Sequence, residues 1–322
     1  MMPARIHLAF VALLGAASQQ AMAQATADHS THTPPTAFGN VTWRNLGPTN
    51  MGGRVDDIAV GRTRGQPDQI YITASSGGIF KSTNGGTSWS PVFDGVKGSM
   101  SMGAVAVSKS HPNVVWAGTG EETTVAYYWG DGVYKSVDGG KSWLHMGLRD
   151  IRHTGRIAIH PSNPEIVFVA AQGRMWGPNT ERGVFKTTDG GRTWKKVLYV
   201  DENTGANDVV LDPTNPMIMY ASSYQRQRKS YGGITVGPGS AIYKSTDGGD
   251  SWRKVTSGLP TVEMGRIGLD VSPVDPKLIY ADIEVSGSRY PAPQGSDGDC
   301  VMGGRGNNAF ESAGGVFRST DG

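Results

Sequence analysis

One short sequence box recurs along this chain and constrains its fold more than any other feature. The box reads Ser/Thr-x-Asp/Asn-Gly-Gly-x-Ser/Thr-Trp in four complete copies, and a fifth copy is cut off where the chain stops. Its copies follow one another at steps of 54, 51, 58 and 74 residues, counted from Ser82, Ser136, Thr187, Ser245 and Ser319. A fixed motif at this period is typical of a repeat architecture, in which each copy marks one supersecondary unit.

Each box is predicted to be a β-hairpin that carries a packing wedge. An apolar, an aromatic and a basic residue precede it, as in Ile79–Lys81, and these are typical of a short strand. Glycine tolerates positive φ, and the Asp or Asn before it bonds its own backbone two residues on. The closing Trp is expected in the core between neighbouring units. We therefore interpret the repeated aspartates as turn residues and not as catalytic acids, namely Asp138, Asp189 and Asp247.

Four short strands are predicted in each period. In the first unit they span 55–60, 69–74, 78–82 and 88–93. This pattern predicts an all-β fold, a β-propeller with four-stranded blades, because a solenoid has shorter repeats and a sandwich does not repeat its sequence. Four and a half blades do not close a ring, so we expect an N-terminal portion of a longer chain. The blades are expected at about 50–95, 100–148, 153–200, 205–258 and 263–322.

The first 37 residues are predicted to lie outside the propeller. Arg5, an apolar run over 6–17 and the small residues Ala21 and Ala23 follow the order of a secretory signal peptide that is cleaved after Ala23. A membrane anchor is disfavoured because the run has about 12 residues, whereas spanning a bilayer takes about 20. Residues 24–37 are polar and unpatterned, which is typical of a flexible leader. The sequence thus predicts a periplasmic or secreted protein without a membrane span.

The composition bounds the partners of this protein. The chain has 46 Gly, 18 Pro and a formal net charge of +2. A charge so near zero disfavours nucleic acid as a partner. The one cysteine, Cys300, has no second cysteine for an internal disulfide, and the sequence motifs indicate neither a metal nor a cofactor. The sequence does not specify an oligomeric state.

The boxes resemble the Asp-box, also called the bacterial neuraminidase repeat. From about Phe38 onward, the chain is similar to exported bacterial Asp-box propellers that are glycosyl-hydrolase-like or similar to the N-terminal domain of sortilins. The resemblance implies a propeller that acts on or binds a polysaccharide; the alternatives are a non-catalytic propeller that binds peptide or anionic ligands, or an envelope scaffold. Apart from the boxes, the segments that carry this resemblance are Trp43–Pro48, Gly52–Arg54, Gly118–Glu121 and Arg182–Thr187.

Two departures from this group bear on activity. Sialidases carry an Arg-Ile-Pro signature at a carboxylate-binding arginine, and Gly53–Val55 is the nearest match in this chain. Xyloglucan-cleaving propellers place an Asp just before the Gly-Gly that opens the third strand of blade one, where this chain reads Ser75–Gly78. Both activities are therefore disfavoured by the sequence, which leaves open whether the protein is an enzyme.

The propeller face opposite the box hairpins is predicted to hold the site. On that face lie the loop that enters each innermost strand and the loop between the second and third strands. Gly-Arg pairs open the innermost strand in blades one, three and five, so Arg54, Arg156 and Arg266 can converge on an anionic group. Alternatively, each arginine pairs with an acid of a neighbouring blade, such as Asp56 or Glu121.

The long loops between the second and third strands supply further candidates. Their aromatic and basic residues suit sugar stacking or peptide docking, and the alternative is that the aromatics cap the blade tops. The ligand-binding candidates here are Tyr128, Trp129, Trp176 and Arg226. A glycosidase needs two carboxyl groups about 5 to 10 Å apart across one bond. The catalytic candidates on this face are Glu121, Glu122 and Asp57, with Asp56 beside them.

Overall fold

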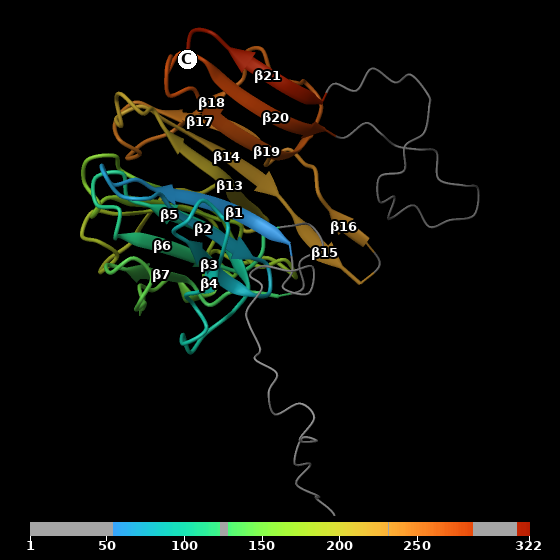
Figure 1. The fold of residues 1–322 in the computed structure, drawn as a ribbon. Helices are drawn as coiled ribbons and strands as arrows, with labels where there is room; N and C mark the ends of the chain where they lie inside the picture. The colour runs from blue at the N-terminus through green and yellow to red at the C-terminus, as the bar shows by residue number, and fades with distance from the viewer. Residues whose placement is uncertain (1–53, 123–127, 231, 286–313) are drawn as a thin grey trace, which may run out of the picture. The chain divides into compact units, whose positions relative to one another are not determined.

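The computed structural model of this chain describes residues 54–122, 128–230, 232–285 and 314–322. The chain divides into two compact units, Met1–Arg44 and Asn45–Gly322, and every element described below belongs to the second. That unit is built from antiparallel β-sheets (Figure 1), with a short 3-10 helix, η3 (Arg149–Ile151), after the second sheet. The predicted all-β class is confirmed.

Three sheets have four strands each, joined in the order in which the chain runs. The first consists of β1 (Val55–Gly61), β2 (Gln69–Ala74), β3 (Gly78–Ser82) and β4 (Ser90–Pro91). The second consists of β5 (Met102–Val107), β6 (Val115–Thr119), β7 (Val133–Ser136) and β8 (Leu144–His145). The third consists of β9 (Thr154–Ile159), β10 (Val167–Ala171), β11 (Gly183–Thr187) and β12 (Lys195–Leu198).

The fourth sheet has the same four-strand plan and a small insertion. It consists of β13 (Thr204–Leu211), β14 (Met219–Gln225), β17 (Ala241–Ser245) and β18 (Arg253–Val255). A two-stranded hairpin that the sequence did not predict, β15 (Gln227–Lys229) and β16 (Gly232–Ile234), continues from the end of β14 (Figure 1). The described part of the fifth sheet has β19 (Met264–Val271), β20 (Ile279–Val285) and β21 (Gly315–Ser319).

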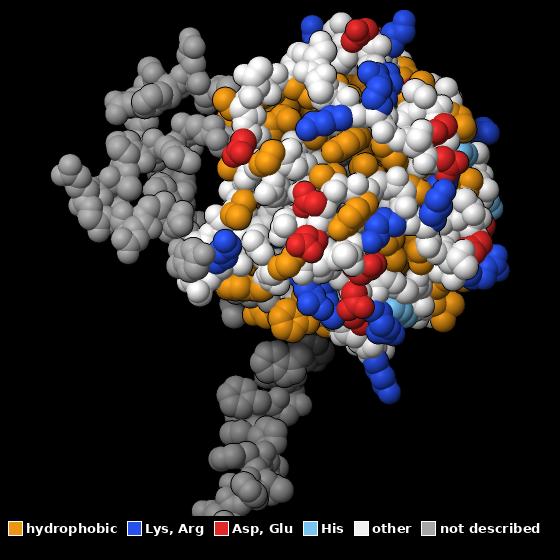
Figure 2. Space-filling view, turned by 180° about the vertical axis from the view of Figure 1, so that it is seen from behind, with side chains coloured by type: hydrophobic (Ala, Val, Ile, Leu, Met, Phe, Trp, Pro, Cys, Tyr) orange, Lys and Arg blue, Asp and Glu red, His pale blue; other side chains and the backbone are white. Residues whose placement is uncertain are grey.

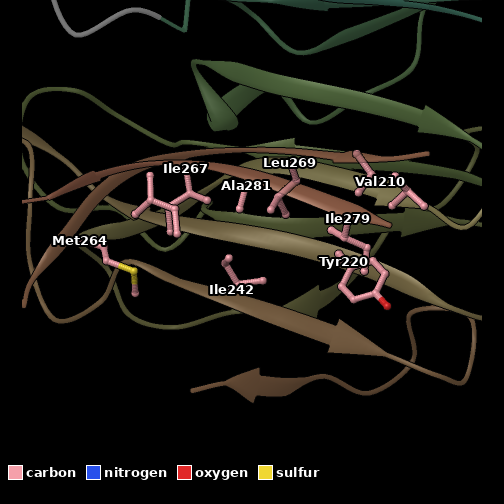
Figure 3. Packing of buried hydrophobic residues seen from close by; sticks show 10 residues of the cluster. Val210, Tyr220, Ile242, Met264, Ile267, Leu269, Ile279 and Ala281 are labelled. Atoms are coloured by element: carbon pink, nitrogen blue, oxygen red, sulfur yellow. The ribbon is translucent and has the colours of Figure 1, made fainter. Parts of the chain in front are cut away.

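The first strands of successive sheets lie next to one another, in the order β1, β5, β9, β13 and β19. Apolar side chains from neighbouring sheets meet at each junction and form a separate core there. Figure 3 shows the core at the last junction, where Val210, Tyr220 and Ile242 pack with Ile267 and Leu269. Four-stranded blades stacked face to face, with the first strand of each innermost, make up a β-propeller, so the predicted architecture is confirmed.

The box hairpins follow the third strand of each blade, and a hydroxyl–carboxylate pair holds each one except the first, where Ser82 pairs with the amide of Asn84. In the second blade, Ser136 Oγ donates to Asp138 and accepts from the Gly140 N–H, both at 2.8 Å. Asp138 accepts from the hydroxyl and the N–H of Ser142, at 2.6 and 2.9 Å, and these bonds hold its pKa well below the usual range. Gly139 and Gly140 have φ of 72° and 88°, the conformation in which glycine is favoured. The aspartate is therefore a turn residue, as predicted.

A lysine from the preceding blade binds each box hairpin from the second to the fifth. Lys81 Nζ donates to the Gly139 carbonyl oxygen, and Lys186 Nζ donates to that of Gly248, both at 2.8 Å. Equivalent bonds join Lys135 to Gly190 and Lys244 to Gly322. Each lysine also lies over the ring of the aromatic residue that it faces on the neighbouring strand. These pairs are Lys81 with Tyr71, Lys135 with Trp116, Lys186 with Phe168 and Lys244 with Tyr220. The basic residue before each box thus serves an inter-blade contact.

The closing tryptophans are half-buried and pack against the apolar cores, Trp143, Trp194 and Trp252 at junctions between two blades and Trp89 within the first blade. Trp143 Nε1 donates to the Val92 carbonyl and Trp194 Nε1 to the Met146 carbonyl, both at 2.7 Å. Trp252 instead donates to Gly249 in its own box, at 3.2 Å. The indole N–H requires an acceptor, and these acceptors are loop carbonyls at the rim of the blade.

The Ser136→Ala variant tests the hairpin. It leaves the buried Gly140 N–H without its acceptor, so we expect a loss of about 1 to 3 kcal/mol in the free energy of unfolding. Chemical denaturation of this chain measures the change. Val137→Ala, at a 61% exposed position of the same hairpin, is the matched control and should change stability by less than about 0.5 kcal/mol. Equal effects of both variants would contradict the assigned role of the hydroxyl.

Candidate functional site

A cavity of about 460 Å³ opens where the innermost strands begin, and we call it the mouth. In the first blade this is the end at which Val55 pairs with Ala74 and Ala74 with Gly78, whereas the box follows Ser82 at the other end of β3. The mouth therefore lies at the opposite end of the strands from the box hairpins. Its charged side chains are six carboxylates and two guanidiniums, namely Asp56, Asp57, Glu122, Asp208, Asp282, Glu284, Arg156 and Arg266.

A β-bulge determines which side chains reach the mouth. Each innermost strand is irregular in its pairing with the second strand within its first few residues. Glycine occupies the bulged position in three blades, at Gly103, Gly155 and Gly265, because a Cβ there would overlap a backbone oxygen of a nearby segment. Asp56 and Asn207 hold this position in the other two blades, and both line the mouth.

The same register corrects the prediction that three arginines share one repeat position. Arg156 pairs with Ala170 just after its bulge, and Arg266 holds the equivalent place in β19. In β1 that place belongs to Asp57, whose N–H donates to Thr73 Oγ1 at 2.9 Å. Arg54 lies on the N-terminal side of the bulge. Its carbonyl accepts from the Ser75 N–H, and the next residue, Val55, pairs with Ala74 before the register shifts.

Asp57 and Asp208 connect neighbouring blades through the backbone. Asp57 accepts from the Val105 N–H of the second blade at 2.9 Å, and Asp208 accepts from the Leu269 N–H of the fifth at 3.0 Å. Arg156 lies between the two carboxylates, 3.3 Å from Asp208 and 4.0 Å from Asp57. Burial raises the pKa of both carboxyl groups, and Arg156 opposes that rise. These bonds favour a structural role for Asp57 over a catalytic one.

Glu121 and Glu122 follow β6 and pair with different arginines. Glu121 is 2% exposed and forms an ion pair with Arg54. Glu122 lines the mouth and forms an ion pair with Arg266 of the fifth blade. Burial raises the pKa of Glu122, while the charge of Arg266 lowers it. The alternative in which each arginine pairs with an acid of a neighbouring blade therefore describes Arg54 and Arg156, whereas Arg266 pairs across the opening with the second blade.

Asp56 differs from the other acids of the mouth because its Oδ2 is buried and has no hydrogen-bond partner. Burial, followed by the charge of Glu122, raises the pKa of Asp56 to about 7, against the lowering effects of Arg54 and Arg266. A carboxyl group with such a pKa can hold or release a proton near neutral pH. Sequence analysis placed Asp56 on this face without singling it out. The signal that marks it is an acid where three blades have glycine.

A second cleft has a volume of about 470 Å³ and shares no lining residue with the mouth; we call it the aromatic cleft, and it is lined by Ser76, Ser99, Met100, Ser101, Tyr128 and Trp129. Two hydroxyl groups fix the backbone of its aromatics: Ser99 Oγ donates to the Trp129 carbonyl at 3.0 Å, and Ser101 Oγ to the Tyr128 carbonyl at 3.1 Å. Their side chains are 62% and 60% exposed. Ser101 Oγ also accepts from the Glu121 N–H at 3.1 Å, and the next residue, Glu122, lines the mouth.

Two further predicted binding residues have contrasting positions. Trp176 is 48% exposed, and the Arg228 guanidinium lies 5.7 Å from the centre of its ring. Arg226 was expected on an exposed loop but is only 4% exposed. Its Nη1 donates to the Glu122 carbonyl at 2.9 Å and to Gln172 Oε1, and these bonds hold the side chain inward. Cys300 and the predicted signal peptide lie outside the described residues.

The surface of the blades mixes both signs of charge, since Figure 2 shows acidic and basic side chains interspersed over one face. Within the described ranges, no cluster of three or more His, Cys, Asp or Glu side chains could hold a metal ion. No helix in this part of the chain is long and apolar enough to cross a membrane.

The fold and the mouth define the chain as a β-propeller whose central opening is lined by carboxylates and arginines. The family model described as sortilin, neurotensin receptor 3, matches residues 131–282. A solved structure of an ancestral GH74 enzyme superimposes with a TM-score of 0.54 over 76% of this chain and 29% of that chain. Its sequence is 24% identical, so this similarity shows a shared fold.

Two xyloglucanases are similar in sequence to this chain. A xyloglucanase from Paenibacillus sp is 26% identical over 244 residues, which cover 68% of this chain and 22% of the relative. A xyloglucanase from Hypocrea jecorina is 25% identical over 245 residues, which cover 68% of this chain and 28% of the relative. The chain thus spans about a quarter of the length of the relatives it matches.

The Asp56→Asn variant tests the electrostatics of the mouth. Because the pKa of Asp56 in the folded chain, about 7, exceeds its ordinary value of 3.8, the folded state binds the proton more tightly, and wild-type stability falls as pH rises between these values. Asparagine removes this dependence. We compare the free energy of unfolding of the variant with that of wild type at each pH. Between about pH 4 and about pH 8 this difference should shift in favour of the variant by on the order of 1 kcal/mol, a value that allows for solvent screening.

Thermal or chemical denaturation at both pH values measures this difference. Asp94→Asn, the same chemical change at an exposed position, controls for the loss of a carboxylate. A difference between wild type and Asp56→Asn that stays constant with pH would contradict the assigned environment.

Proposed function

We propose that this chain is part of an exported Asp-box propeller that binds a polysaccharide across the aromatic cleft and hydrolyses it at the mouth. The observation that carries the proposal is the link between the two sites through Ser101. The rings of Tyr128 and Trp129 are exposed in the aromatic cleft, and Ser101 bonds both Tyr128 and Glu121, the residue before Glu122 of the mouth. Flat aromatic surfaces suit the apolar faces of sugar rings, while paired carboxyl groups suit cleavage of the glycosidic bond.

In this proposal the two carboxyl groups of the mouth have different roles. Glycoside hydrolysis requires one protonated acid for the leaving oxygen and one carboxylate that acts as base or nucleophile. Asp56, with a pKa raised by burial to about 7, holds the proton. Glu122, which is paired with Arg266, serves as the second group. Similarity to xyloglucanases supports polysaccharide as the ligand class, although the sequence departs from these enzymes at Ser75–Gly78.

A second candidate is a non-catalytic propeller that binds peptides. The match of residues 131–282 to the sortilin family model favours it. The two candidates differ in ligand and in turnover, so one set of measurements separates them.

The Trp129→Ala variant tests binding, with calorimetric titration of xyloglucan and other plant glucan oligosaccharides into this chain. Loss of the stacking surface should weaken affinity about tenfold. Tyr280→Ala is the control, because Tyr280 is 41% exposed and pairs with Arg318 toward the box end of β20.

Polysaccharide turnover should fall by about 100-fold or more in Asp56→Asn, with little change in affinity. Peptide binding without glycan binding would favour the second candidate, and unchanged turnover in Asp56→Asn would remove that residue from the mechanism.

Export is the remaining part of the proposal, and it rests on the predicted signal peptide over residues 1–23. We expect the mature protein to begin at Gln24 when it is expressed in a bacterium with its own N-terminus. N-terminal sequencing of protein recovered from the periplasm or medium measures this. An unprocessed chain retained in the cytoplasm would contradict it.

A further inference from the structure

Two arginines are enclosed where the loops of the third and fourth blades meet. Arg182 is 0% exposed and Arg226 is 4% exposed. Among the described residues, neither guanidinium lies within ion-pair distance of a carboxylate, although both remain charged at neutral pH because burial lowers their pKa only to about 10. A buried charge without a counter-ion costs several kcal/mol, so each site needs a source of compensation.

Arg182 obtains that compensation from the chain itself. Its Nε donates to Asn179 Oδ1 at 2.8 Å. Its two terminal nitrogens donate to backbone carbonyl oxygens, which belong to Gln172, Arg174, Gly177, Asn203 and Arg226. Arg182 thus has a structural role, because its hydrogen bonds join the segment 172–179 to Asn203 and Arg226 of the fourth blade.

Arg226 has no such set of acceptors. Only its Nη1 is bonded, to the Glu122 carbonyl and to Gln172 Oε1. Its Nε and Nη2 are buried without a hydrogen-bond partner, as is the hydroxyl of Tyr224. The Nε–H and Nη2–H bonds point the same way along one edge of the guanidinium, and that edge matches the two oxygens of a planar carboxylate.

Arg226 is hydrogen-bonded through Nη1 to a residue that lines the mouth, while Arg226 and Tyr224 themselves are not among the lining residues. Glu122, whose carbonyl accepts from Arg226, lines the mouth, and Gln172 donates from Nε2 to Asn207 Oδ1 at 2.8 Å in the same wall. Tyr224 lies close enough to Arg226 for the cation to lower its pKa, but burial raises that pKa to about 12. The hydroxyl is therefore neutral at pH 7 and can donate a third hydrogen bond to an anion.

The nearby surface carries the same sign of charge. Arg228 lies over the exposed ring of Trp176, and the two residues are joined by a β-bridge. Arg174 is exposed on the same loop and forms no ion pair in the described part of the chain. A cationic rim with an aromatic surface thus stands beside a mouth in which acids outnumber arginines. This division suits a polymer that carries regularly spaced carboxylates and is cleaved between them.

We propose that Arg226 and Tyr224 form a subsite for the carboxylate of a uronic acid residue, so that the polysaccharide bound by this propeller is acidic. The inference rests on the proposed function and specifies its substrate class. In this desolvated position a bidentate ion pair is stronger than at the surface, and together with a bond from Tyr224 it satisfies the buried donors that these two residues leave unpaired.

The first test compares two ligands on the wild-type chain, so it does not depend on any variant folding. Calorimetric titration at one ionic strength measures affinity for oligogalacturonate and for the same oligomer with its carboxyl groups reduced to alcohols. We expect the acid to bind at least about tenfold more tightly. Equal affinities would overturn this inference and leave the proposed function intact, whereas no binding of any glycan would overturn the proposed function itself.

The second test separates a ligand role from a structural one. Tyr224→Phe removes a hydroxyl that has no partner in the chain, so a purely structural role predicts no loss of affinity. We expect it to weaken oligogalacturonate binding about fivefold and to leave binding of the reduced oligomer unchanged. Tyr220→Phe, at another buried tyrosine of β14, is the matched control and should change neither affinity.

Arg226→Gln completes the series, because it should abolish the preference for the acid. Retention of that preference in a variant that folds, as judged by circular dichroism, would overturn the assignment of Arg226. Two other outcomes would also count against the inference. A sulfated glucan that binds as tightly as oligogalacturonate would show that the site recognises anions in general, and Arg226-dependent capture of a peptide C-terminus instead of any glycan would assign the carboxylate to a different ligand.

Discussion

The contact between one blade and the box hairpin of the next is the interaction on which the rest of this structure depends. A single four-stranded sheet cannot bury both of its faces, so each blade is stable only against its neighbours. The repeated bond from Lys81 to Gly139, and its equivalents along the chain, fixes the rotation of each blade relative to the next. Because the glycine carbonyl is positioned by the turn, the Ser136–Asp138 pair controls an inter-blade distance as well as a hairpin.

The mouth follows from that arrangement. Innermost strands held side by side bring their first residues together, and the bulges direct those residues inward. Where the backbones approach most closely, glycine is required, as at Gly155. Where there is room, Asp56 and Asn207 project into the opening. The concentration of acids is tolerated because Arg156 and Arg266 pair across blades and because backbone N–H groups stabilise Asp57 and Asp208.

Within this opening, the physical environment separates acids that look alike in sequence. Asp56 and Asp57 are neighbours, yet Asp57 accepts two backbone N–H groups whereas Asp56 has a buried oxygen without a partner. Arg182 and Arg226 differ in the same way, since one has all its nitrogens bonded and the other has one bonded. Unpaired buried polar atoms require either water or a ligand, and among the residues that carry them Asp56 lines the mouth while Arg226 is hydrogen-bonded to a residue that does.

The sequence by itself determined the repeat, the four-strand plan of the blades, and the role of residues such as Asp138 and Gly139, because these depend on interactions between residues a few positions apart. It also indicated that the box hairpins and the loops rich in charge lie at opposite ends of the strands. Only the tertiary structure decided that Arg54 does not share the position of Arg156, that Arg226 is enclosed, and that Asp56 is the acid with a buried, unpaired oxygen. The reason is that bulge register, burial and cross-blade pairing depend on contacts between segments up to 144 residues apart, such as that from Glu122 to Arg266, and local sequence patterns do not encode which of those contacts form.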